Sequence, residues 1–494
     1  MTAIHEVGSA SLSDDTATRL YLNGSWQDAS DGGTFTDINP TTAQPLTEIA
    51  SATAADVDAA VRAARSQLNG EWGATPGAVR GRLLNKVADL IERDADLLAR
   101  LEAIDVGKAI GQPSLLDVPN AIATFRYFAG WADKIQGSSI PTAGYFGKPT
   151  HSYTVREPVG VIGAIVPWNT PLMIAAWKLG PALAAGNTVV VKPPEDAPLS
   201  ILHLARLLHE AGIPAGVVSV LPGPGETTGD AIAGHPDVNK ISFTGSPAVG
   251  KIITKRAADT FKKVTLELGG KSPQIILEDA DLEAAIDGTA MGLFFNQGQI
   301  CAAGTRVLVH RSLYSQVVEG LSAAAAAQVL GDPLNPETTM GALVNAKQRD
   351  TVLEYIQAGV DGGARIAAGG GRPDRDGFFV EPTIFVDADN RMKIAKEEIF
   401  GPVGTVIPFD TPDEALAIAN DTDYGLAATI WTRDVSRAHT LAAEIQAGAV
   451  WVNGWAAIDP ALPWGGIKTS GVGRELGWAG IEANTEEKVI TIVL

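Results

Sequence analysis

The feature that most constrains the fold is a series of short, almost wholly apolar stretches separated by longer segments with helical spacing. Four of these stretches lie between residues 159 and 245 and read VGVIGAIVPW, TVVVKP, VVSVLPG and KISFTG. Segments such as PLMIAAWKLGPALAAG and SILHLARLLHEAG separate them. A strand that is apolar along its whole length is buried on both faces, as in a parallel sheet covered by helices. The pattern therefore predicts a Rossmann-like α/β unit.

The same alternation predicts further elements on either side of this unit. Upstream, the spacing favours a helix over DVDAAVRAARSQL and one long helix over residues 81–107, closed by a glycine. Downstream, a second α/β unit is expected, with strands PQIIL, TRVLVH, GTVIPF, AATIWT and AVWVN. The glycine-rich stretch PWGGIKTSGVGRELGWAG is expected to be a loop. HSYTVREPVG and EEKVITIVL look like strands without a partner in either unit, so we expect a small added sheet, suited to pairing between subunits.

Composition excludes several classes of protein. A length of 494 residues suggests two or three domains. The net charge of −19 disfavours a nucleic-acid partner, because phosphate binding needs a basic surface. The first 20 residues lack the basic region and apolar core of a secretory signal and are expected to be a frayed leader. No apolar run is long and clean enough to span a bilayer, so a cytoplasmic protein without a membrane partner is expected.

Cys301 is the only cysteine in the chain. A lone cysteine is often just a small buried hydrophobic residue. Metal binding is disfavoured, and we expect no metal site, because one cysteine and scattered histidines give no ligand spacing. The small neighbours in GQICAAG would leave room for a carbonyl substrate and for backbone amides that hold an oxyanion. A thiolate attacks carbonyl carbon readily, and Glu267, after a short apolar strand in TLELGGKS, is either the accompanying base or a solvated loop end.

Seven short motifs in a fixed order decide between these alternatives. They read VPWN (166–169), KPPE (192–195), FTGS (243–246), LELGGKSP (266–273), NQGQIC (296–301), EEIFGPV (397–403) and PWGGIKTSGVGRELG (463–477). Together they resemble the aldehyde dehydrogenase superfamily, from about residue 20 to the C-terminus, with closest likeness to the phenylacetaldehyde dehydrogenase branch. Each motif alone is a weak signal, but the ordered set is specific. The resemblance implies an NAD-dependent, hydrolytic enzyme that oxidises aldehydes to carboxylic acids.

The resemblance also implies catalytic roles for five residues. Cys301 matches the nucleophile that forms a thiohemiacetal and then a thioester, and Glu267 matches the residue that activates the hydrolytic water. Asn169 matches the amide that stabilises the oxyanion together with the backbone N–H of Cys301; removing one such donor costs about 10²–10³ in rate. Lys178 and Glu475 match a proton-relay pair, although a snorkelling lysine and a surface acid are the alternatives.

Cofactor contacts follow in the same way. Lys192 and Glu195 resemble the pair that binds the adenosine ribose, and a carboxylate there favours NAD over NADP, which stays possible. GSPAVG opens a helix whose N-terminus suits a pyrophosphate. The cofactor-binding residues implied are Trp168, Lys192, Glu195, Gly245, Ser246, Gly250, Glu398 and Phe400, the last two matching contacts to the nicotinamide ribose and ring.

The substrate wall implied by the resemblance is apolar and aromatic. Its candidates are Met173, Trp177, Phe295, Ile300, Trp455, Ile458 and Trp464. Thr170 stands where many relatives have an aromatic residue, which would widen the entrance. The expected substrate is therefore an aromatic or other apolar aldehyde. A betaine or amino aldehyde is the alternative, but it needs carboxylates or an aromatic cage around a cation, and no acidic partner is evident beside the aromatics. A non-catalytic structural relative would need none of the three catalytic residues.

The expected fold is thus α/β, with three parts. Residues 1–137 and 157–266 are expected to form an NAD-binding domain and residues 267–465 a catalytic domain. Residues 138–156 and 481–494 are expected to supply the strands of an oligomerisation extension. The expected assembly is a homotetramer or homodimer.

Overall fold

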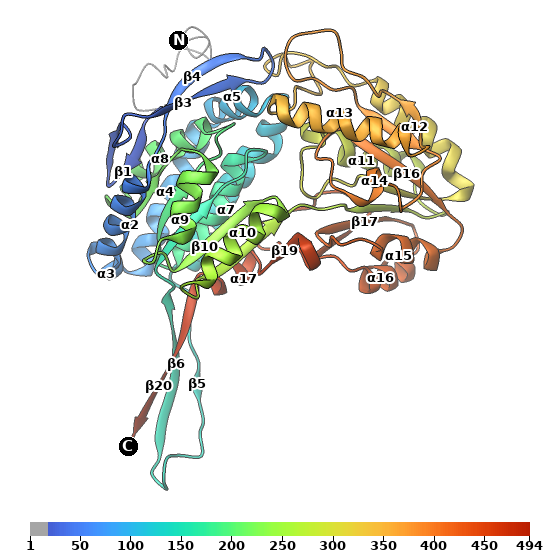
Figure 1. The fold of residues 1–494 in the computed structure, drawn as a ribbon. Helices are drawn as coiled ribbons and strands as arrows, with labels where there is room; N and C mark the ends of the chain where they lie inside the picture. Colours follow the sequence, from blue (N-terminus) through green and yellow to red (C-terminus); the bar gives the residue numbers. More distant parts are fainter. Residues whose placement is uncertain (1–17) are drawn as a thin grey trace.

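The computed structural model describes residues 18–494, so nearly all of the expected leader lies outside the described residues. Figure 1 shows two lobes side by side and a narrow arm that projects away from one of them. The blue-to-green half of the chain builds one lobe and the yellow-to-orange part builds the other. Within the described residues, no helix is both long and apolar enough to cross a membrane.

The first lobe contains the predicted parallel sheet. Its strand order is β19-β11-β10-β7-β8-β9-β1-β2. The parallel core consists of β7 (Val161–Ile165), β8 (Thr188–Lys192), β9 (Val218–Val220), β10 (Lys240–Gly245) and β11 (Lys263–Leu268). Antiparallel edges are added by β1 (Leu20–Leu22), β2 (Ser25–Gln27) and β19 (Gly471–Val472).

Alternate residues of these strands belong to two separate apolar cores. Val189 and Val191 pack with one group of helices, whereas Val190 between them packs with another. The first group is α4 (Gly77–Arg93), α5 (Ala95–Val106), α6 (Val118–Trp131), α7 (Pro171–Ala184) and α8 (Leu199–Ala211). The second is α2 (Ala54–Leu68), α9 (Asp230–Gly234) and α10 (Pro247–Ala258). Helices on both faces explain why the strands are apolar throughout, and the α/β prediction is confirmed.

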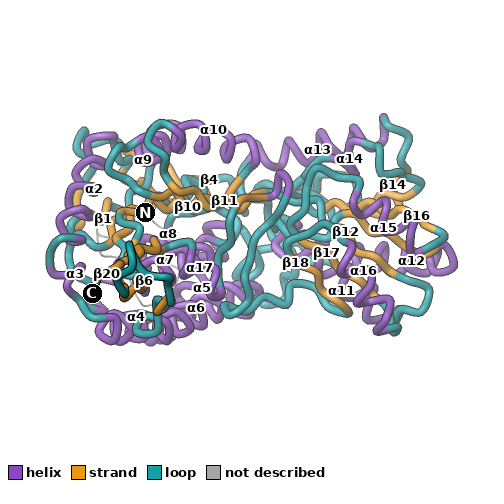
Figure 2. The backbone as a smooth tube through the Cα atoms, turned by 90° about the horizontal axis from the view of Figure 1, so that it is seen from below, coloured by secondary structure: helices purple, strands orange, loops and turns teal. Residues whose placement is uncertain are grey.

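The second lobe repeats this plan. Its sheet has the order β14-β15-β16-β13-β12-β17-β18, parallel except at the β14 edge. The strands are β12 (Pro273–Ile276), β13 (Arg306–His310), β14 (Arg365–Ala368), β15 (Thr383–Val386), β16 (Val403–Phe409), β17 (Ala427–Trp431) and β18 (Ala449–Val452). Its helices are α11 (Leu282–Phe294), α12 (Tyr314–Ala326), α13 (Ala346–Asp361), α14 (Lys393–Lys396), α15 (Pro412–Asn420) and α16 (Val435–Glu444). Figure 2 shows this lobe beside the first one, seen from below.

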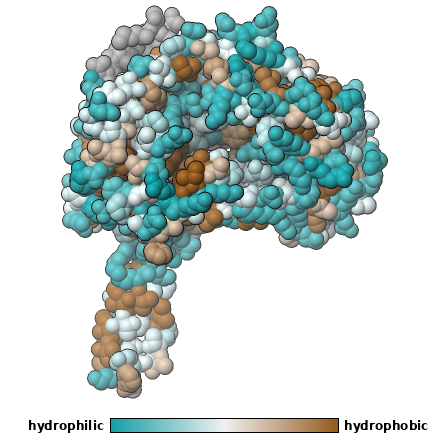
Figure 3. All heavy atoms as spheres, viewed as in Figure 1, coloured by the Kyte–Doolittle hydropathy of each residue, from teal (hydrophilic) through white to brown (hydrophobic). Residues whose placement is uncertain are grey.

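The two strands without a predicted partner pair with each other in the arm. β20 (Thr485–Val493) runs antiparallel to β6 (Thr150–Pro158) over its full length, and β5 (Ser139–Ile140) adds a third strand. The arm exposes apolar side chains, including Phe146, Val489 and Leu494, and Figure 3 shows brown atoms along it. The added sheet is confirmed, whereas pairing between subunits stays a prediction.

Three local expectations were wrong. The long helix over 81–107 is interrupted at Asp94, whose backbone leaves helical geometry between α4 and α5. The glycine-rich C-terminal stretch is not only a loop: it contains β19 and the helix α17 (Gly477–Glu482), because it packs onto the first sheet. Glu267 does not follow its strand but lies within β11, paired with Thr244 and Gly471.

Some elements gave no recognised signal in the sequence. The hairpin of β3 (Thr34–Asn39) and β4 (Gln44–Ala50) and the short helix α3 (Glu71–Ala74) are examples. Single-turn helical segments also occur: η2 (Pro113–Asp117), η3 (Gly225–Gly229), η4 (Phe295–Gly298), η5 (Arg311–Leu313) and η6 (Lys468–Ser470).

Candidate active site

The candidate site lies where the strands of the first sheet end. Asn169 follows β7, Lys192 ends β8, Gly245 ends β10 and Glu267 is the penultimate residue of β11. These four strands are neighbours and run parallel. The carboxyl ends of parallel strands meet at one edge of a sheet, which is where α/β proteins bind ligands. The fold therefore brings four separate sequence motifs to the same edge.

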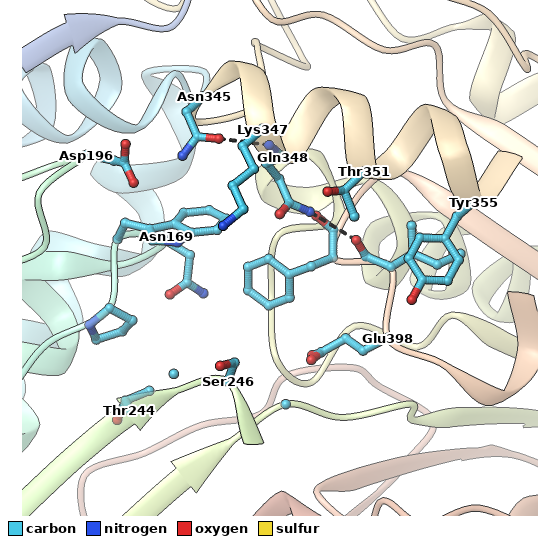
Figure 4. Close-up of a pocket in the computed structure, with 16 residues that line it drawn as sticks. Asn169, Asp196, Thr244, Ser246, Asn345, Lys347, Gln348, Thr351, Tyr355 and Glu398 are labelled. Atoms are coloured by element: carbon cyan, nitrogen blue, oxygen red, sulfur yellow. Dashed lines mark hydrogen bonds between the residues drawn. The ribbon is translucent and has the colours of Figure 1, made fainter. Parts of the chain in front are cut away.

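A cavity of about 470 Å³ opens at this edge, between the two lobes (Figure 4). Both lobes contribute to its wall. The first lobe supplies Pro167, Trp168, Asn169, Asp196, Thr244, Gly245, Ser246 and Gly269, and the second lobe supplies the rest. The residues from the second lobe are Asn345, Lys347, Gln348, Thr351, Tyr355, Glu398, Ile399 and Phe400. Six of the predicted site residues are thus brought together in one wall: Trp168, Asn169, Gly245, Ser246, Glu398 and Phe400.

Cys301 lies in a turn after α11, beyond a left-handed segment formed by Asn296 and Gln297, at φ +49° and +56°. Two consecutive non-glycine residues in this region are unusual. Their side chains are anchored, Asn296 to the carbonyl of Asn169 and Gln297 to the carbonyl of Ala342. Cys301 itself is half-buried. Burial, with the charges of Glu398 and Glu267, raises the pKa of its thiol to about 12, so the resting group is a protonated thiol.

Glu267 is a buried carboxylate without a hydrogen-bond partner. It is 3% exposed, and neither oxygen contacts a donor in the described residues. Burial and the charge of Glu475 raise the pKa of Glu267 well above its usual range. A Cβ on Gly465 would lie 2.6 Å from Oε1 of Glu267, so a glycine is needed there to make room. An acid with free lone pairs and a raised pKa has the properties of a general base or acid.

Asn169 is held from both ends. Its Nδ2 donates to the carbonyl of Gln299 at 2.9 Å, which leaves the second amide hydrogen for another acceptor. Its own carbonyl accepts from Asn296 Nδ2 and from Lys108 Nζ, each at 2.9 Å. The asparagine is therefore linked directly to the loop that carries Cys301.

Lys178 and Glu475 form a buried ion pair. Lys178 Nζ lies 2.7 Å from Glu475 Oε1, and it also donates to Thr244 and Ser242. The second oxygen of Glu475 is buried without a partner. The backbone of Glu475 forms two hydrogen bonds with Trp464, at 2.7 and 2.8 Å. The two residues are thus paired rather than separated as a snorkelling lysine and a surface acid.

Glu398 and Phe400 reach the cavity from the second lobe. Glu398 accepts from the backbone N–H of Gly270 at 2.9 Å and rests against Gly269, where no side chain would fit. Burial raises the pKa of Glu398 to about 7. Phe400 adopts φ +56° and packs edge-on against Trp168, with ring centroids 5.2 Å apart.

Lys192 and Glu195 lie outside the wall of this cavity. They form an ion pair of 2.8 Å, and Glu195 Oε1 also accepts from the backbone N–H of Gly225. Burial lowers the pKa of Lys192, whereas the Glu195 side chain is 41% exposed. Ser246 caps α10 through its hydroxyl, and Gly250, in the next turn, packs against Leu268.

These features fit a dinucleotide. The exposed carboxylate of Glu195 can accept from a ribose, and α10 is long enough for its N-terminal dipole to bind a pyrophosphate. Val249 and Ile252 on α10 are exposed apolar residues, of the kind that an adenine ring can cover. Ile252, Lys347 and Gln348 lie outside all of the sequence motifs, and Val249 lies within GSPAVG but was not predicted as a contact.

Most of the predicted substrate residues belong to the large apolar core of the first lobe or pack against it. Met173, Trp177 and Trp464 belong to its buried core, and Ile300, Cys301, Trp455 and Ile458 are partly buried against it. Trp464 lies 6.0 Å from both Trp177 and Trp451, and Phe295 lies 6.1 Å from Trp455 (ring centroids).

A second cavity, of about 390 Å³, lies beside β18 and the loop that follows. Trp451, Ile458 and Trp464 contribute to its wall, and so does the exposed carboxylate of Asp459. No residue lines both cavities. The expectation that no acid lies beside the aromatics was therefore incomplete.

The chain is similar to known proteins in both sequence and structure. Residues 26–490 match the Aldehyde dehydrogenase family. The chain is 46% identical over 479 residues to retinal dehydrogenase 2 of Homo sapiens, which covers 96% of this chain and 92% of that protein. The NAD⁺ complex of an aldehyde dehydrogenase from Bacillus cereus superposes with a TM-score of 0.95 at 46% identity, covering 97% and 96% of the two chains. A mutant of the P. syringae indole-3-acetaldehyde dehydrogenase AldA, in complex with NAD⁺ and IAA, superposes with a TM-score of 0.94 at 44% identity and 97% coverage of both chains.

Proposed function

The chain belongs to the aldehyde dehydrogenase family and is an NAD-dependent aldehyde dehydrogenase; from this premise we propose a hydrolytic oxidation of apolar aldehydes that uses Cys301 as nucleophile. The proposal depends mainly on one observation: Asn169, Glu267 and Cys301 lie close together at the edge of the first sheet. Both oxygens of Glu267 are without a hydrogen-bond partner and can accept a proton.

The first half of the reaction forms an adduct on Cys301. The thiolate adds to the aldehyde carbonyl and gives a thiohemiacetal, whose oxyanion accepts from Nδ2 of Asn169 and from the backbone N–H of Cys301. Cys301 must first lose its proton, because burial raises the pKa of its thiol to about 12; we propose that this proton passes to solvent water. Bound NAD supplies the hydride acceptor and a positive ring, which favours the thiolate. Loss of hydride from the adduct leaves a thioester.

The second half hydrolyses the thioester. Glu267 takes a proton from water, and the hydroxide formed adds to the thioester carbon; collapse releases the acid and the Cys301 thiolate. The proton must then leave a buried carboxylate. Glu475, whose charge acts on Glu267 and whose second oxygen has no partner, is the proposed next acceptor, and Lys178 is its ion-pair partner.

The proposed cofactor contacts divide between the two lobes. Glu195 and Lys192 bind the adenosine ribose, and the α10 N-terminus at Ser246 binds the pyrophosphate. Glu398 holds the nicotinamide ribose, and Phe400 with Trp168 bounds the nicotinamide ring. A 2′-phosphate would face the Glu195 carboxylate, so we propose preference for NAD over NADP.

The proposed substrate class is aromatic or other large apolar aldehydes. Trp177 and Trp464 lie in the apolar core of the first lobe, and Trp455 and Cys301 pack against that core. Burying a charge among them without a partner is costly, and each buried CH₂ contributes about 0.8 kcal/mol. The test is kcat/KM for acetaldehyde, hexanal, phenylacetaldehyde, indole-3-acetaldehyde and betaine aldehyde, with NAD and with NADP. Highest kcat/KM for acetaldehyde or betaine aldehyde would refute the apolar assignment and leave the dehydrogenase assignment standing.

One observation favours a second candidate, a cationic amino aldehyde. Asp459 lines the second cavity together with Trp451 and Trp464, and a carboxylate beside aromatic faces suits a cation. Asp459→Asn distinguishes the two. If a cationic amino aldehyde is the substrate, this substitution should lower kcat/KM for the amino aldehyde about tenfold. If an aromatic aldehyde is the substrate, kcat/KM for phenylacetaldehyde should stay within twofold of the wild-type value.

A further inference from the structure

A buried cluster of charges stands behind the candidate oxyanion asparagine. Lys108 follows α5 and is buried, with 1% of the residue exposed. Its Nζ lies 2.9 Å from Glu102 Oε2 and 2.5 Å from Asp117 Oδ2, and both carboxylates are buried. Burying three charged groups is unfavourable unless their geometry is good, and such clusters add little stability over an apolar core. The other contacts of the cluster therefore indicate its function better than its contribution to stability does.

The third contact of Lys108 is the carbonyl of Asn169, at 2.9 Å. An ammonium group has three N–H donors, and Lys108 uses one each for Glu102, Asp117 and Asn169. Burial opposes the charge on Lys108, but Asp117 and Glu102 outweigh it and keep its pKa above the usual value. The two carboxylates thus hold a charged donor against this peptide.

The same cluster also holds the helix that follows Asn169. Glu102 Oε1 accepts from the backbone N–H of Leu172, in the first turn of α7, and from Ser200 Oγ. On its other side, the Asn169 carbonyl accepts from Asn296 Nδ2, in the left-handed segment before Cys301. Both acceptor positions of this carbonyl are occupied, one by the charge cluster and one by the cysteine loop. The backbone of Asn169 is clamped between them.

We propose that Lys108 is a positioning residue for catalysis: it fixes the Asn169 peptide so that the side-chain amide meets the developing oxyanion next to Cys301. This inference depends on the proposed role of Asn169. Lys108 touches neither substrate nor cofactor in this arrangement and acts only through the asparagine. A displacement of about 1 Å at such a donor is enough to lower the rate about a hundredfold.

The test compares Lys108→Met/Asp117→Asn with Asp117→Asn alone. Lys108→Met by itself would leave two carboxylates without their cation and is prone to misfold, whereas the double variant removes one of them. Asp117→Asn is the matched control, because it makes the same change in the cluster and keeps the bond from Lys108 to Asn169. The measurement is the single-turnover rate of NADH formation with saturating phenylacetaldehyde, beside the KM and the melting temperature of each variant.

We expect the double variant to form NADH about tenfold or more slowly than Asp117→Asn, with the aldehyde KM changed less than threefold. The decisive comparison repeats both variants in an Asn169→Ala background, where loss of Lys108 should slow the reaction less than twofold further, because residues that act as a unit are not additive. Lys108 would be purely structural if its loss slowed NADH formation equally with and without the Asn169 side chain. The same would follow if its loss lowered the melting temperature and left the rate unchanged. If Asn169→Ala alone left the rate unchanged, the oxyanion assignment itself would fail.

Discussion

Replacing Glu267 by glutamine should separate the two halves of the reaction. Glutamine keeps the shape of the side chain but cannot take a proton. In the structure both carboxylate oxygens are buried without a donor, so the substitution breaks no hydrogen bond of the described residues. We therefore expect the variant to fold normally and to form one NADH per active site in a rapid first phase.

The steady-state rate should then fall, because the thioester is not hydrolysed. General base catalysis contributes about 10²–10⁴ in rate, so loss of Glu267 should lower kcat at least about a hundredfold, or about 2.7 kcal/mol. The assay is stopped-flow absorbance of NADH under excess phenylacetaldehyde, followed to steady state. Absence of the rapid phase would mean that Glu267 also acts before hydride transfer, and an unchanged kcat would refute its role as the base.

A pH series gives an independent check. Burial raises the pKa of Glu267 well above 4.5, so the folded protein retains a proton that the unfolded chain loses. Stability from this group therefore declines as pH rises from 4.5 to the raised pKa and is constant above it. Glu267→Gln lacks this decline, so its melting temperature relative to wild type should increase with pH. The kcat of wild type should rise with pH as Glu267 ionises, and a flat profile would contradict the raised pKa.

Four further outcomes are expected. Glu195→Ser should lower the NAD:NADP ratio of kcat/KM about tenfold or more, since it removes a carboxylate that opposes a 2′-phosphate; equal use of both cofactors by wild type would refute this contact. Thr170→Phe should raise the KM for phenylacetaldehyde more than that for acetaldehyde, and the reverse order would exclude Thr170 from the entrance. Lys178→Met should slow steady-state turnover at least about tenfold and spare the first burst of NADH, and a lost burst would argue against a relay restricted to hydrolysis. Removal of residues 486–494 should expose the edge of β6 and yield smaller species by light scattering than wild type, whereas a wild-type protein that is already a stable, active monomer would contradict an oligomerisation arm.

Much of the fold was predictable because it depends on local patterns. The strands at the centre of the first sheet are apolar on both faces, and the structure confirms that alternate residues such as Val189 and Val190 enter different cores. Local patterns failed where a tertiary contact overrides them. The glycine-rich C-terminal stretch becomes β19 because it pairs with β11, more than 200 residues earlier in the chain, and Asp94 interrupts a helix whose spacing is continuous.

Short motifs were sufficient to identify the proposed catalytic residues as candidates. Asn169, Glu267 and Cys301 each lie in such a motif, at strand ends or in a turn, so the local sequence is enough to mark them as candidates. The sequence also shows that the chain has a single cysteine and a net charge of −19. These properties are local or additive, and no knowledge of distant contacts is needed to read them.

Which groups act on one another depends on contacts that form only in the folded protein. The ion pair of Lys178 and Glu475 joins residues 297 positions apart, and the contact from Lys108 to Asn169 joins two segments that no motif connects. The same is true of Glu267: its raised pKa arises from burial and from the charge of Glu475, and the LELGGKSP motif indicates neither of these. Electrostatic interactions depend on distance and desolvation, and both are fixed only when the chain has packed.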